Sequence, residues 1–184
     1  VNPPQWLKNV MDPEKHVVFL DTSPLGAAAY ETKLPLTNES EMTFVLSVLG
    51  SFIARGIDAD DMCALSPFNA QVDAIESALG KFASLKKVES LTIDRAQGRD
   101  MKAVCISFVR SNEQHVAGEL LNDRRRLNVA LTRAKKKLVL IGAIDTLRSS
   151  PALADAHELL KREGWITPVT NESLDHAKRL LEKY

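Results

Sequence analysis

Residues 124–141 read Arg124-Arg-Arg-Leu-Asn-Val-Ala-Leu-Thr-Arg133-Ala-Lys-Lys-Lys-Leu138-Val-Leu-Ile141, and two patterns meet within them. The first part places apolar residues at helical spacing, which predicts a helix over about 123–135. Residues 138–141 form a continuous apolar run, which is typical of a strand buried on both faces of a parallel sheet. A helix that leads directly into such a strand predicts an α/β unit.

The same alternation continues toward both ends of the chain. Further apolar runs predict strands at residues 17–20, 62–65, 88–93 and 103–109. Apolar residues at helical spacing predict helices at residues 38–55, 71–79, 152–163 and 172–183. We therefore expect the α/β class, with a mostly parallel sheet and helices on both of its faces.

The length of 184 residues and a hydrophobic content of 45% allow one core of ordinary size. We interpret residues 1–15 as a linker or the end of a preceding region, 16–166 as the folded domain and 167–184 as a C-terminal helix. Small and polar residues predict loose, exposed loops at residues 23–36 and 111–118.

The composition excludes several classes of protein. Lysine plus arginine and aspartate plus glutamate number 24 each, so any surface that attracts nucleic acid must be local. Cys63 and Cys105 lie in apolar runs, which favours buried reduced thiols over a disulfide or zinc site, and the four histidines are too scattered for a metal site. No apolar run approaches the roughly 18 to 20 residues that span a bilayer, so we expect no membrane partner. The N-terminal sequence has no pattern of a secretory signal.

A second informative stretch, Leu91-Thr-Ile-Asp-Arg-Ala-Gln-Gly-Arg-Asp100, follows a predicted strand. The chain contains no phosphate loop of the form G-x-x-x-x-G-K-[ST]. On the predicted helix, Arg126 and Arg133 would lie about 10 Å apart on nearly the same face. From this position, the two arginines could contact a phosphate group held by a neighbouring domain. Arginines on helices are also commonly solvated, and this alternative is favoured for Arg124 and Arg125.

These stretches resemble the superfamily 1 helicases, in the 1B branch that includes RNA-decay and replication helicases. Residues 92–100 are similar to helicase motif V, 125–134 to motif VI, and 66–71 to motif IV. The phrases Ser107-Phe-Val-Arg-Ser-Asn112 and Gly118-Glu-Leu-Leu-Asn-Asp123 are most similar to the replication helicase-nucleases. The resemblance covers about residues 17–142.

The resemblance implies a RecA-like P-loop NTPase fold, as the second, C-terminal motor domain of an ATP-dependent 5'-to-3' DNA helicase of replication and repair. Such a domain closes against the first RecA-like domain of the same chain, with ATP and Mg²⁺ between them, and binds single-stranded DNA. It further implies a nuclear protein with a nuclease and an iron-sulfur cluster elsewhere in the parent chain. An RNA helicase of the same branch, or a non-catalytic anion-binding module, remains an alternative. The RNA helicase and a prokaryotic protein would be cytoplasmic.

The resemblance also implies roles for individual residues. Arg133 would be the arginine finger, and Arg126 a second cation that faces phosphate or positions a motif. Gly98 and Asp100 would border ATP, although Asp100 replaces the glutamate common in the superfamily. Gln71 would contact ATP or hold the cleft, unless it is an ordinary exposed glutamine.

Three polar side chains are expected to contact the single strand: Thr92, Gln97 and Ser66. A hydroxyl or an amide can bind phosphate oxygens without recognising the base sequence. Because the fragment lacks both the phosphate loop and the acidic motif that holds magnesium, the resemblance implies that it hydrolyses no ATP alone.

Overall fold

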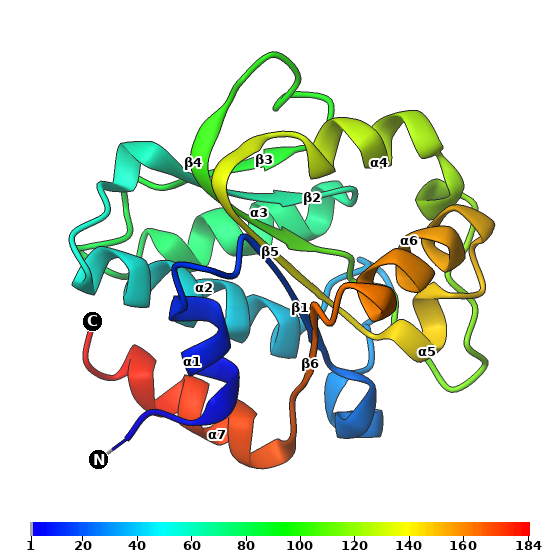
Figure 1. Cartoon of the computed structure of the whole chain (residues 1–184), viewed down its shortest axis with the longest axis horizontal. Coiled ribbons are helices and arrows are strands. Elements are labelled where there is room, and N and C mark those ends of the chain that lie inside the picture. Colours follow the sequence, from blue (N-terminus) through cyan, green and yellow to red (C-terminus); the bar gives the residue numbers. More distant parts are fainter. Residues whose placement is uncertain (1) are drawn as a thin grey trace.

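A six-stranded, entirely parallel sheet forms the centre of the computed structural model, which describes residues 2–184 (Figure 1). The strands are β1 (Val17–Asp21), β2 (Met62–Ser66), β3 (Glu89–Thr92), β4 (Met101–Ser107), β5 (Ala134–Gly142) and β6 (Ile166–Pro168). Their order across the sheet is β3-β2-β4-β5-β1-β6. The predicted α/β class and parallel sheet are confirmed.

Helices cover both faces of the sheet (Figure 1). They are α1 (Gln5–Met11), α2 (Glu39–Ala54), α3 (Asn69–Leu79), α4 (Arg124–Leu131), α5 (Ile144–Leu147), α6 (Pro151–Arg162) and α7 (Asn171–Leu181). Side chains alternate along each strand, so Val18 and Leu20 pack on the face covered by α1, α2, α3 and α7, whereas Phe19 packs on the face covered by α4, α5 and α6. Two hydrophobic clusters, one on each face, form the core.

Residues beyond both predicted domain boundaries belong to the same core. Helix α1 lies in the segment interpreted as a linker, yet its Trp6 is 2% exposed and packs edge-on against Phe44 of α2, with ring centroids 5.4 Å apart. Strand β6, which the sequence did not predict, pairs with β1 across the expected boundary at residue 166. The expected C-terminal helix is present as α7, and residues on both sides of positions 15 and 166 pack in one core, so these positions do not separate folded units.

This position of α1 gives a stability prediction. Replacing Trp6 with alanine should lower the free energy of unfolding by about 3 to 5 kcal/mol, because a large buried ring is lost from the core. Urea denaturation of the 184-residue chain measures this change, with Gln5→Ala on the exposed side of the same helix as the control. A Trp6→Ala effect within about 0.5 kcal/mol would show that α1 does not belong to the core.

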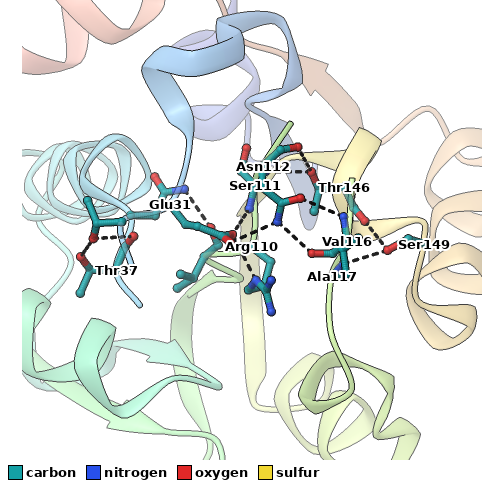
Figure 2. A network of polar contacts seen from close by, with 12 residues as sticks. Glu31, Thr37, Arg110, Ser111, Asn112, Val116, Ala117, Thr146 and Ser149 are labelled. Carbon is teal, nitrogen blue, oxygen red and sulfur yellow. Dashed lines mark hydrogen bonds and ion pairs between the residues drawn. The ribbon is translucent and has the colours of Figure 1, made fainter. Parts of the chain in front are cut away.

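The two segments predicted as loose loops are instead held in place. Residues Ser23–Ala29 form two short 3-10 turns on either side of a kink at Gly26. The carboxylate of Glu31, whose side chain is only 1% exposed, accepts hydrogen bonds from Arg110 Nε (3.1 Å), the Ser111 backbone N–H (2.7 Å) and Asn112 Nδ2 (3.1 Å) (Figure 2). Residues 113–116 are exposed, as predicted for the second segment, and residues 32–35 are exposed in the first. The prediction of looseness was wrong at Glu31, Ser111 and Asn112, because side chains distant in sequence satisfy the backbone there.

The structure also shows the environment of the two cysteines and the length of the helices. Cys63 and Cys105 are free and buried, which confirms their predicted burial. Burial raises the pKa of the Cys63 thiol to about 12 and also raises the pKa of Cys105. None of the helices within residues 2–184 is long and apolar enough to cross a bilayer.

Candidate functional site

The loop of residues 93–100 and helix α4 lie side by side on one face of the sheet. This loop leaves the carboxyl end of β3 and enters the amino end of β4. Because the strands are parallel, the loop must run back across one face of the sheet from its carboxyl edge to its amino edge. Its Ile93 and Ala96 are buried in the same hydrophobic cluster as Ala130 of α4. The motif V-like and motif VI-like segments therefore form one continuous surface.

Helix α4 ends earlier than the sequence predicted. It stops at Leu131, and the chain enters β5 at Ala134, which pairs with Met101 of β4. Arg133 lies beyond the helix, so the helical spacing expected between Arg126 and Arg133 does not apply. Since Arg133 precedes β5, it lies at the amino edge of the parallel sheet and not at the carboxyl edge, where ligands of such sheets usually bind.

The guanidinium of Arg133 is partly held by its own domain. Its Nε donates to the backbone oxygen of Val129 at 3.0 Å, and its Nη2 donates to Thr132 Oγ1 at 3.3 Å. Nη1 lies 3.6 Å from the Asp100 carboxylate, and the side chain is 18% exposed. A guanidinium has five N–H donors, so donors remain for an anion at this edge.

The residues that lead into β4 are exposed beside Arg133. Gly98 has a φ of +79°, and a Cβ atom at this position would meet nothing within 4 Å. The positive φ requires glycine, while the open space allows another molecule to approach the backbone. Arg99 forms a two-point ion pair with Glu89 at 2.6 and 2.8 Å, and this hydrogen bonding lowers the pKa of Glu89. The Asp100 side chain is half exposed.

Arg126 lies between two carboxylates at the other end of the loop. Its Nη2 is 3.1 Å from Asp94 Oδ2 in the loop, and its Nε is 3.7 Å from Asp123 Oδ2. Asp123 also caps α4, because its Oδ1 accepts from the backbone N–H groups of Arg125 and Arg126. A cleft of about 270 Å³ separates the loop from this end of α4, and exposed Gln97 contributes to its wall.

Thr92 and Ser66 lie at the carboxyl edge of the sheet, but only Thr92 is accessible. Thr92 is half-buried, and its hydroxyl accepts from the Arg95 backbone N–H at 3.3 Å. Ser66 is completely buried, and its hydroxyl accepts from the Phe68 backbone N–H. The expectation that Ser66 contacts nucleic acid is therefore corrected.

Gln71 is also completely buried, which contradicts both the expected contact with ATP and the alternative of an exposed helix residue. Its Oε1 accepts from the Asn38 backbone N–H at 3.0 Å, and its Nε2 donates to the Asn38 carbonyl and to Ser107 Oγ, each at 3.0 Å. Every polar atom of this side chain has a partner inside the domain. Gln71 joins α3 to the start of α2 and the end of β4.

The same buried network contains Glu41, which sequence reasoning missed. Glu41 Oε1 accepts from Ser107 Oγ and from the Val109 backbone N–H, both at 2.8 Å, whereas Oε2 is buried without a hydrogen-bond partner among residues 2–184. Burial raises the pKa of Glu41 to about 8. Asn38 followed three residues later by a glutamate, before an apolar run, is close to a helix-capping pattern and was the available signal.

The candidate site residues thus fall into four groups. Asp100 and Arg133 meet at the amino edge, with Gly98 two residues before Asp100, and Gln97 and Arg126 meet at the cleft beside α4. Thr92 begins the same loop at the carboxyl edge, whereas Ser66 and Gln71 are interior. Within residues 2–184, no group of three or more histidine, cysteine, aspartate or glutamate side chains is arranged to hold a metal ion.

This chain is similar to proteins described as DNA helicases and matches one family model. It is similar to the DNA replication ATP-dependent helicase/nuclease DNA2 of Mus musculus, with 37% identity over 174 residues, covering 93% of this chain and 16% of the relative. The Schizosaccharomyces pombe relative of the same description is 35% identical over 161 residues, covering 88% of this chain and 11% of the relative. The chain therefore spans less than a fifth of the length of either protein.

A solved structure, the C-terminal domain of a possible DNA helicase from Lactobacillus plantarum WCFS1, aligns with a TM-score of 0.48 and 14% identity, covering 89% of this chain and 92% of that chain. The family model described as "AAA domain" matches residues 2–145, most of the sheet and the whole of the loop and α4 surface. The chain belongs to the AAA domain family.

Proposed function

We propose that this chain is the C-terminal motor domain of an ATP-dependent 5'-to-3' DNA helicase, within a longer helicase/nuclease of DNA replication and repair. The observation that carries the proposal is the continuous surface formed by the loop of residues 93–100 and α4. It places a cation at the amino edge of the sheet and polar groups toward the carboxyl edge. The relatives' description as DNA replication helicase/nucleases supports the same function.

The amino edge fits one wall of an ATP site. A guanidinium with donors to spare, an exposed carboxylate and an open glycine backbone are groups that bind phosphate and ribose. Bound ATP would supply the phosphoryl group that is transferred to water. The first RecA-like domain of the same chain would hold the rest of the triphosphate and Mg²⁺.

In this site, Arg133 acts as the arginine finger. Its planar, permanently charged fork neutralises negative charge on the transferred phosphoryl group, which lysine does less well. Asp100, 3.6 Å away, orients the fork and offers an acceptor to a ribose hydroxyl. Gly98 allows the nucleotide to approach its backbone because no side chain blocks the approach.

Thr92, at the end of β3, and Gln97, in the loop of residues 93–100, contact the single-stranded nucleic acid. Their hydroxyl and amide groups bind phosphate oxygens, so they bind different base sequences equally. DNA is the proposed strand and the nucleus the proposed location, because the relatives are described as DNA replication proteins. The two cysteines of this chain are buried and do not fit the four thiolates of an iron-sulfur cluster, so any such cluster lies elsewhere in the longer protein.

The isolated 184-residue chain should bind ATP weakly and show no ATP hydrolysis. The physical reason is that the sequence contains no phosphate loop to hold the triphosphate. A phosphate-release assay with purified chain, with the full-length protein as the positive control, measures this. Sustained turnover by the fragment would contradict the proposed division of the site between two domains.

The proposed substrate is tested on the full-length protein. ATP hydrolysis should rise on addition of single-stranded poly(dT), and an otherwise equal duplex with a 5' overhang should be unwound in preference to one with a 3' overhang. Stimulation by poly(U) but not by poly(dT) would favour an RNA helicase of the same branch. No stimulation by either strand would contradict the motor function.

A further inference from the structure

Arg126 differs from the other arginines at the start of α4 because two carboxylates lie close to its guanidinium. Asp94 approaches its Nη2 at 3.1 Å and Asp123 its Nε at 3.7 Å, so one cation faces two anions. Arg124, by contrast, extends to Asp155 of α6 at 2.6 Å, away from the loop. A guanidinium placed between two carboxylates is poorly suited to attract a further phosphate group.

The ion pair between Asp94 and Arg126 joins the loop, which carries a proposed contact to the single strand, to α4, which leads to the proposed ATP contact at Arg133. Asp94 lies two residues after Thr92 and three before Gln97, the proposed strand contacts. Arg126 lies in the first turn of α4, and the last turn of that helix carries the Val129 carbonyl that holds the Arg133 Nε at 3.0 Å. A displacement of the loop by a bound strand would therefore move α4 at one end and the arginine finger at the other.

A second connection closes the same unit at the amino edge. Arg133 Nη1 lies 3.6 Å from Asp100, and the Met101 backbone N–H donates to the Arg133 carbonyl at 3.0 Å. The loop is thus joined to α4 at one end and to Arg133, just after α4, at the other, with the cleft of about 270 Å³ near the Asp94 end. Such a unit can transmit a displacement because α4 carries Arg126 at one end and holds Arg133 through the Val129 carbonyl at the other.

We propose that Asp94 and Arg126 form a positioning pair that couples strand binding at the loop to the placement of Arg133 in the ATP site. The inference rests on the proposed function and assigns Arg126 to the loop, not to phosphate. The pair is exposed, with Arg126 42% and Asp94 64% accessible. An exposed ion pair contributes little to stability, so its removal should alter coupling without unfolding the domain.

The test compares ATP hydrolysis by the full-length protein with and without single-stranded poly(dT). Asp94→Asn should reduce the stimulation by poly(dT) roughly 5-fold or more, the range of typical coupling between two sites. The exchange Asp94→Arg with Arg126→Asp should recover part of the lost stimulation, because it restores an ion pair of reversed polarity. Asp155→Asn, which removes the other ion pair of α4, is the matched control and should leave stimulation unchanged.

The outcomes separate the inference from the proposed function. Stimulation of Asp94→Asn within twofold of the unaltered protein would overturn the inference alone, as would an exchange variant no better than Asp94→Asn. An equal loss in Asp155→Asn would also overturn it, since any disturbance of α4 would then have the same effect. Absence of stimulation in the unaltered protein would contradict the proposed function itself.

Discussion

Replacing Arg133 with alanine in the full-length protein should lower ATP hydrolysis by roughly 10³-fold or more, the contribution of arginine fingers in related chemistry. Duplex unwinding should be lost with it, whereas affinity for single-stranded DNA should stay nearly unchanged. The reason is position: Arg133 lies beside Asp100 at the amino edge of the sheet, away from Thr92 at the carboxyl edge. Steady-state ATP hydrolysis and fluorescence anisotropy with labelled poly(dT) measure the two properties.

Arg124→Ala is the matched control because Arg124 lies on the neighbouring helix and pairs with exposed Asp155. It should retain ATP hydrolysis close to that of the unaltered protein. Arg133→Lys should recover little, because an ammonium group lacks the planar fork. If Arg133→Ala weakens DNA binding as strongly as it slows hydrolysis, Arg133 belongs to the strand site and the proposed role is wrong.

Replacing Glu41 with glutamine should change how the stability of the domain depends on pH. Burial raises the pKa of Glu41 from its ordinary value of 4.5 to about 8, so between these values the folded chain retains a proton that the unfolded chain releases. The stabilising effect of this proton is complete below pH 4.5 and is lost as the pH rises to about 8. One retained proton changes the free energy of unfolding by about 1.4 kcal/mol per pH unit.

Glutamine keeps an oxygen for Ser107 and Val109 but carries no ionisable proton. The Glu41→Gln variant should therefore lose this one-proton dependence and exceed the unaltered domain in stability at pH 8. Urea denaturation at several values between pH 5 and pH 8 measures the slope, and Glu39→Gln, exposed on the same turn of α2, serves as the control. Parallel curves for Glu41→Gln and the unaltered domain would show that Glu41 is ionised in the folded state throughout this range.

The strands were predictable because their signal is local. Residues 138–141 and 62–65 are continuous apolar runs, and burial on both faces of a parallel sheet requires that pattern. The end of α4 was not predictable in the same way. Ala134 and the lysines after it favour a helix by intrinsic preference, but pairing with β4 places them in a strand.

Short elements were missed for a related reason. Strand β6 has only three residues and contains Pro168, so its existence depends on pairing with β1. Helix α1 has seven residues and follows two prolines, and Trp6 stabilises it through packing with Phe44. Neither carries enough local pattern to be recognised without its partner.

The candidate site shows the same division between local and distant information. The resemblance to helicase motifs identified the loop and α4, and the structure places these segments side by side. It did not reveal that Ser66 and Gln71 are interior, because polar residues are buried only where partners compensate them. Those partners, such as Asn38 and Ser107, lie more than 30 residues from Gln71.

The most direct measurement is a structure of the full-length protein with a non-hydrolysable ATP analogue and Mg²⁺. A guanidinium nitrogen of Arg133 should lie within hydrogen-bonding distance of a γ-phosphate oxygen, with Asp100 and Gly98 beside the nucleotide. A closed nucleotide site in which Arg133 remains directed only at Val129 and Asp100, without contact to phosphate, would contradict the assignment of the arginine finger.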